Sequence, residues 1–177
     1  GNTLLAPAHK NRNNSLMTFD YVISNPPFKL NFSEYRDDLD KKENNDRFFT
    51  GIPKVPAKKK AAMEIYLVFL QHIIFSLKPE GKGAIVVPTG FITARMGIAS
   101  KLLHYLIDEK IVRGVISMPP NVFGRTGTSV SILFIDKTKA NQSDVILIDA
   151  SNLGEQIRVG KNQKTVLRPD EIEKVIT

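Results

Sequence analysis

Short apolar runs alternate along the chain with polar, turn-rich segments, and their order indicates the fold. Residues 19–24 (FDYVIS) form a β-branched and aromatic run that is typical of a buried strand. Residues 61–77 are apolar on most sides and, at about 25 Å long as a helix, favour a helix packed against a sheet. Residues 84–90 (AIVVPTG) predict a second buried strand, and residues 99–110 have the spacing of an amphipathic helix.

The later part of the pattern completes an α/β sheet. Three more strands are expected within residues 111–119, 128–137 and 144–151. Alternating strands and helices predict βαβ units and a mostly parallel sheet. The link between residues 111–119 and 128–137 is too short for a parallel crossover, so those two strands should run antiparallel if they are neighbours. Residues 168–177 begin like a helix, with a proline near its first position and acids in its first turn.

Residues 29–60 differ in composition from both flanks. Charges of both signs, glycines and prolines predict a long, exposed, mobile loop there. The whole chain has 177 residues, 42% of them hydrophobic, which suits one globular domain. Because its start is polar and irregular and its final helix is short, we expect a fragment of a longer chain.

Composition narrows the functional classes only moderately. A net charge of +7 and a pI of about 9.6 are compatible with a polyanionic partner but do not require one. The absence of cysteine excludes disulfides and cysteine-based metal or redox sites. No apolar run is long enough to span a membrane and no signal peptide is visible, so we expect a cytoplasmic protein. No metal site is predicted, because the histidines are scattered singly at His9, His72 and His104.

Candidate chemistry lies directly after the first predicted strand, at Asn25-Pro26-Pro27-Phe28. Both prolines lack an N–H and hold φ near −65°, so the strand ends in a stiff turn on the side where α/β sheets bind ligands. The Asn25 side-chain oxygen and the Pro26 carbonyl could accept both N–H groups of a nucleobase amino group, whose nitrogen would then become nucleophilic. Phe28 offers a stacking surface worth about 1–3 kcal/mol. The alternative is a purely structural turn, which is how we interpret the second Pro-Pro pair at residues 119–120.

The residues of this region resemble a known family. The stretch "FDYVISNPPF" resembles the catalytic motif of amino-group DNA methyltransferases, which use S-adenosylmethionine and extrude the target base. The four-residue motif alone also occurs in ribosomal RNA guanine and release-factor glutamine methyltransferases. Nearly the whole chain, however, is similar to the modification (methyltransferase) subunit of type I restriction–modification systems, above all residues 70–90, 116–137 and 145–151.

The resemblance implies an adenine-N6 DNA methyltransferase with the Rossmann-like, S-adenosylmethionine-dependent fold, here partial, whose last strand is antiparallel. It implies that Asn25, Pro26 and Phe28 hold the adenine and that Pro27 shapes the turn. Asn25 and Asn2 would lie nearest the cofactor. The implied partners are double-stranded DNA and the specificity and restriction subunits of the same system.

Two parts of the family pattern do not occur in this sequence: the glycine-rich cofactor motif and the N-terminal helical domain. We therefore expect residues 1–177 to form a partial catalytic domain that binds the cofactor poorly and is inactive alone. Two alternatives stay open. One is an RNA guanine or protein glutamine methyltransferase, and the other is a non-catalytic DNA-binding or assembly module.

Several charged residues around the motif have two interpretations. Lys58, Lys59 and Lys60 either grip the DNA backbone or form a solvated surface, and Arg95 and Arg125 are further candidates for DNA contact. Glu64 is expected on the exposed first turn of the long helix, where an acid complements the helix dipole. Residues 126–129 (TGTS) are interpreted as a structural turn.

Overall fold

The computed structural model describes residues 2–123, 128–138, 144–160 and 162–176. Its centre is a sheet in the order β1-β2-β4-β3-β5. Its strands are β1 (Phe19–Ser24), β2 (Leu77–Pro88), β3 (Val112–Ser117), β4 (Val130–Asp136) and β5 (Ile146–Asp149). β1 pairs parallel with β2, and β3 with β5, whereas β4 is antiparallel to both of its neighbours. This confirms a mostly parallel sheet with an antiparallel strand near the end.

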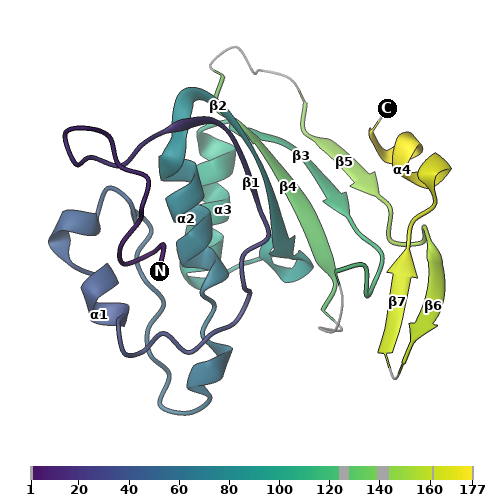
Figure 1. Ribbon diagram of the computed structural model, residues 1–177, viewed down its shortest axis with the longest axis horizontal. Helices are drawn as coiled ribbons and strands as arrows, with labels where there is room; N and C mark the ends of the chain where they lie inside the picture. The colour runs from purple at the N-terminus through teal and green to yellow at the C-terminus, as the bar shows by residue number, and fades with distance from the viewer. Residues whose placement is uncertain (1, 124–127, 139–143, 161, 177) are drawn as a thin grey trace.

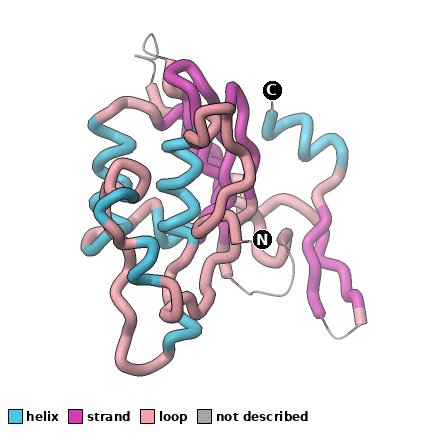
Figure 2. Tube along the Cα trace, turned by 60° about the vertical axis from the view of Figure 1, so that its left-hand side comes forward, coloured by secondary structure: helices cyan, strands magenta, loops and turns pink. Residues whose placement is uncertain are grey.

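Two helices, α2 (Tyr66–Ser76) and α3 (Gly97–Asp108), cover one face of the sheet (Figures 1 and 2). The core between them includes the fully buried side chains of Leu70, Leu102 and Leu133. Each such burial contributes about 1.5–3 kcal/mol. The long helix predicted from residue 61 begins only at Tyr66, because residues 60–62 form a separate 3₁₀ turn, η2 (Lys60–Ala62), and Met63 is extended.

The prediction that residues 19–24 form a buried strand is wrong. The strand is present, but Tyr21 is 74% and Ile23 88% exposed, while Val22 between them packs against the core. β1 lies at one end of the sheet, and helices α2 and α3 cover one face of it (Figure 1), where Val22 packs against the core.

The prediction of a long, exposed loop over residues 29–60 is wrong for part of that segment. This segment contains α1 (Arg36–Leu39) and the 3₁₀ turn η1 (Lys42–Asn44). It buries a second cluster, in which Phe32, Leu39, Phe48 and Ile52 are no more than 4% exposed and pack against Leu4, Met63, Ile65 and Val68. These apolar residues are too irregularly spaced to show a helical or strand period. That any of the segment is mobile stays a prediction.

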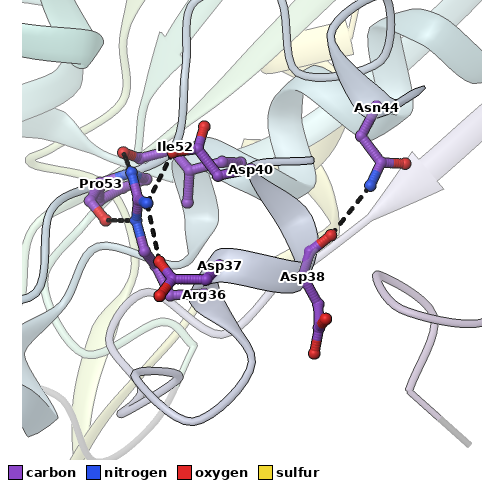
Figure 3. A network of polar contacts seen from close by, with 7 residues as sticks. All are labelled: Arg36, Asp37, Asp38, Asp40, Asn44, Ile52 and Pro53. Carbon is purple, nitrogen blue, oxygen red and sulfur yellow. Dashed lines mark hydrogen bonds and ion pairs between the residues drawn. The ribbon is translucent and has the colours of Figure 1, made fainter. Parts of the chain in front are cut away.

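Within that segment, the Arg36 guanidinium links α1 to the backbone of residues 52–53. It forms ion pairs with Asp40 at 2.6 Å and with Asp37 at 3.0 Å, and it donates to the carbonyls of Ile52 and Pro53, each at 3.3 Å (Figure 3). Its charge is therefore neutralised within α1 and is not offered to a ligand.

The C-terminal part adds a β-hairpin that the sequence did not predict, formed by β6 (Glu155–Val159) and β7 (Asn162–Val166), followed by α4 (Pro169–Ile176). The hairpin projects away from the sheet at the end toward which β3 runs (Figure 1). Among the residues of its two strands, Thr165 alone is buried, 3% exposed, and its hydroxyl donates to the Pro120 carbonyl at 2.5 Å. Val175 of α4 packs on the sheet face opposite α2 and α3.

Two negative findings concern the described residues only. None of their helices is long and apolar enough to cross a membrane. No three of their histidine or carboxylate side chains gather closely enough to hold a metal ion.

Candidate active site

A cavity of about 1070 Å³ opens at the carboxyl end of the parallel strands. Segments distant in sequence line it: the turn after β1, the residues before α2, the η3 turn (Thr89–Phe91) with the start of α3, and the loop between β3 and β4. Such an edge is where α/β sheets bind ligands. The cavity is large enough for a nucleobase.

The Asn25–Phe28 turn forms one wall of this cavity. The pairing of β1 with β2 ends at Ser24, and the four residues that follow all line the cavity, with Asn25 and Pro27 exposed and Pro26 buried. Among the residues that the structure describes, neither the Asn25 side chain nor the Pro26 carbonyl has a hydrogen-bond partner. Both oxygens can therefore accept hydrogen bonds from a ligand.

Three aromatic rings in edge-to-face contact support this wall. The half-buried Phe28 ring lies 6.3 Å from Tyr66 at 76°, and Tyr66 lies 6.1 Å from Phe91 at 85°. Tyr66 is 3% exposed, and burial, together with the charge of Glu64, raises the pKa of its hydroxyl. The hydroxyl stays protonated at neutral pH, so Tyr66 fixes the Phe28 ring and does not act as a base.

Sequence reasoning missed several residues of the site, including two in the loop between β3 and β4. Phe123, 44% exposed, and Thr128 line the cavity from the loop that begins with the second Pro-Pro pair. β4 runs back antiparallel between β2 and β3, and this places the loop over the end of β2. An aromatic residue just after a strand end was the available signal. Of the other residues considered in this loop, Arg125 and residues 126–127 lie outside the described residues.

The fold places only some of the charged residues predicted near the site at the cavity. Arg95 and Glu64 line the cavity, and both are exposed. Lys58, Lys59 and Lys60 do not line it. They are exposed at and just before η2, which projects at the same end of the molecule (Figure 1).

Asn2 does not belong to the cavity. Its side-chain oxygen accepts hydrogen bonds from the backbone N–H groups of Leu4 (3.0 Å) and Leu5 (3.3 Å), and so caps a local turn. A role for Asn2 in cofactor binding stays a prediction without support from the geometry.

The mostly parallel sheet, with an Asn-Pro-Pro-Phe turn beside a nucleobase-sized cavity at the end of its first strand, agrees with the Rossmann-like fold of S-adenosylmethionine-dependent methyltransferases. A family profile described as "N-6 DNA Methylase" matches residues 1–177. The chain belongs to this family.

Curated relatives and solved structures agree with this assignment. The chain is 34% identical over 160 residues to the methylase subunit of the type I restriction enzyme MpnII from Mycoplasma pneumoniae, covering 89% of this chain and 27% of the relative. It is 31% identical over 163 residues to the corresponding MjaIX subunit from Methanocaldococcus jannaschii, covering 90% and 27%. A type I methyltransferase subunit from Streptococcus thermophilus superposes with a TM-score of 0.73 at 25% identity, covering 99% of this chain and 34% of that one. The chain thus spans about a quarter of the length of these curated relatives.

The residues of the turn fit the amino substrate of this class of enzyme rather than its cofactor. S-adenosylmethionine supplies a methyl group bonded to a positively charged sulfur. The free acceptor oxygens at Asn25 and Pro26 are the groups that would bring an amino nucleophile to that methyl group. The glycine-rich cofactor loop of the family has no counterpart in the described residues.

Proposed function

We propose that this chain is part of an adenine-N6 DNA methyltransferase, the modification subunit of a type I restriction–modification system. The observation that carries the proposal is the pair of unpartnered oxygens, on Asn25 and Pro26, at the wall of a nucleobase-sized cavity. Family membership supports the reaction and the cofactor.

The mechanism assigns one role to each part of the turn. The Asn25 Oδ1 and the Pro26 carbonyl accept the two N–H groups of the adenine amino group. These hydrogen bonds pull the nitrogen toward a pyramidal shape and restore its lone pair, which aromatic delocalisation had removed. When bound, S-adenosylmethionine would supply the methyl group, and the lone pair that Asn25 and Pro26 restore would be the nucleophile that receives it, the electrons of the methyl–sulfur bond staying on sulfur. The extra proton on nitrogen then leaves to water, so no strong general base is required.

Two rings hold the base in position. Phe28, braced by Tyr66, stacks on one face of the adenine, and Phe123 closes the cavity from the opposite loop. Extruding an adenine from a duplex costs a few kcal/mol, which stacking at about 1–3 kcal/mol per ring offsets. Arg95 and the Lys58–Lys60 group contact the phosphates.

The proposed setting follows the family. The curated relatives named above are methylase subunits of type I restriction enzymes. We propose that this protein likewise acts on double-stranded DNA in the cytoplasm, together with specificity and restriction subunits.

The test replaces Asn25 by alanine in the full-length gene product assembled with its own partner subunits. Transfer of labelled methyl groups to DNA should fall at least about 100-fold, because one preorganised hydrogen-bonding group is typically worth that much. Asn13→Ala, at an exposed asparagine far from the cavity, is the matched control and should keep full activity. Undiminished DNA methylation by Asn25→Ala would exclude the proposed site. Activity on RNA or protein alone would favour the other methyltransferase classes. The 177-residue chain by itself is expected to transfer no methyl groups in the same assay.

A further inference from the structure

A second groove adjoins the active-site cavity. It measures about 770 Å³ and shares Lys29, Glu64, Met96 and Ala99 with the cavity, so the two lie side by side. The walls of this groove come from residues 50–56, from the segment just before α2, and from the first turns of α3. The proposed function assigns nothing to this groove.

The groove carries positive charge that the protein does not neutralise. The side chains of Lys29, Lys54 and Lys101 line it, and all three residues are exposed. None of them has an ion pair or a side-chain hydrogen bond within the part of the chain that the structure describes. They come from three separate segments, so they are not a run of neighbouring surface lysines.

The negative charges of the groove are fewer. Asp40 is paired with Arg36 at 2.6 Å, so the charges of these two groove residues offset each other, although Arg36 also pairs at 3.0 Å with Asp37, which does not line the groove (Figure 3). Among the described residues that line the groove, Glu64 is the only carboxylate left without an ion pair, and it lies where groove and cavity meet. Three unmatched cations therefore face one unmatched anion, and Arg95 adds a further cation on the cavity side.

We propose that this groove binds the sugar–phosphate backbone of the DNA strand that carries the target adenine, on one side of the extruded nucleotide. The inference rests on the proposed function. A nucleotide whose base enters the cavity leaves its neighbouring phosphates at the cavity mouth, and the strand must continue along the surface from there. The groove adjoins that mouth and is lined with unpaired lysines, as a groove that follows the DNA backbone should be.

The first experiment measures the salt dependence of binding. The full-length gene product binds a fluorescent duplex with one adenine opposite an abasic site, which lowers the cost of extrusion. The test variant combines Lys29→Gln, Lys54→Gln and Lys101→Gln. The control removes the same charge at the exposed lysines Lys10, Lys110 and Lys174, which the groove does not include.

The groove variant should reduce the slope of log Kd against log salt concentration by about 2–3, since each phosphate contact contributes about 0.9. The control should change the slope by less than about 1. Equal reductions in both variants would show a general charge effect and overturn the proposal, as would an unchanged slope in the groove variant. Circular dichroism checks that each variant folds, and the three single substitutions repeat the test if the triple variant does not fold.

The second experiment places the contact on one side of the adenine. Neutral methylphosphonates replace two phosphates on either the 5′ or the 3′ side of the target. On one side of the adenine, the methylphosphonates should weaken DNA binding by the wild type but have little effect on binding by the groove variant. On the other side, they should affect both proteins equally. The proposal is overturned if the methylphosphonates weaken wild-type binding more than groove-variant binding by the same amount on both sides. It is also overturned if they do so on neither side. Poly-glutamate that competes with DNA for the wild type but not for the groove variant would indicate an acidic peptide as the ligand, which also overturns it.

Failure of the proposed function gives a different result. Asn25→Ala should lose methylation and keep the wild-type salt slope. Persistent methylation in that variant would refute the proposed chemistry, whereas the slopes alone decide on the groove.

Discussion

Acidification should destabilise the fold through one pair of side chains, Arg47 and His72. Arg47 is 6% exposed and donates to the carbonyls of Leu4 (2.7 Å) and Thr3 (3.1 Å) and, through Nε, to Nδ1 of His72 (3.0 Å). Burial and the nearby guanidinium lower the pKa of His72 to about 4. A protonated ring would lose the acceptor at Nδ1 and face a second positive charge, so His72 is neutral in the folded protein.

The size of this destabilisation follows from the difference in the pKa of His72 between the folded and the unfolded protein. In the unfolded chain, His72 takes up its proton near the ordinary pKa of 6.5, but in the folded protein only near about 4. Between these values the unfolded state binds more protons, so the free energy of unfolding falls as the pH falls. Without solvent screening, the free energy of unfolding falls by about 2 kcal/mol between pH 8 and pH 5. Because His72 is partly exposed, solvent screening reduces this to roughly 1–2 kcal/mol.

Urea unfolding followed by far-ultraviolet circular dichroism at pH 8, 7, 6 and 5 measures this loss. His72→Gln keeps an acceptor oxygen for Arg47 but cannot titrate, so this variant should lose about 1–2 kcal/mol less than the wild type over the same range. His9→Gln, at an exposed histidine, is the control and should follow the wild type. If His72→Gln and the wild type lose stability in parallel, the pair is not the source of the acid sensitivity and the reasoning fails.

Three further predictions concern other parts of the structure. Phe28→Ala should raise the Kd for DNA with an unpaired adenine by about 5- to 100-fold, measured by anisotropy, because one stacking surface is lost; Phe28→Tyr should restore binding. Thr165→Val removes the hydroxyl that donates to Pro120 and should cost about 1 kcal/mol in urea unfolding; an unchanged midpoint would contradict this. Gly114→Ala should lower the melting temperature, because a Cβ there would lie 2.9 Å from the Ile146 carbonyl oxygen and disturb the β3–β5 pairing; a wild-type melting temperature would show that the backbone shifts freely.

Local sequence signals predicted some elements well and others poorly, for physical reasons. β1 was predicted to the residue, because the proline turn ends it sharply. β2 starts at Leu77, seven residues before the predicted range, since "KPEGKG" has the composition of a turn. Glycine at position 81 in fact permits close pairing with β1: a Cβ there would lie 2.9 Å from the Phe19 carbonyl oxygen. Such close approach between strands leaves no mark in composition.

In the active site, too, local sequence signals predicted some residues and not others. The motif at residues 25–28 was readable because chemistry, stiffness and position coincide in neighbouring residues. The contributions of Tyr66 and Phe123 were not, because only the fold brings α2 and the β3–β4 loop to that wall. The β6–β7 hairpin escaped prediction because, apart from Thr165, its strand residues are exposed on both faces and show no clear alternation.

The position of β1 at the end of the sheet has a practical consequence for handling this chain. Within the described parts of the chain, the outer main-chain N–H and C=O groups of β1 have no strand beside them, and two large apolar side chains, Tyr21 and Ile23, are exposed next to them. Unpaired edge strands of this kind can pair with strands of other molecules. When this 177-residue polypeptide is purified alone, we expect concentration-dependent self-association through that edge strand, and a charged substitution such as Ile23→Lys should keep it monodisperse.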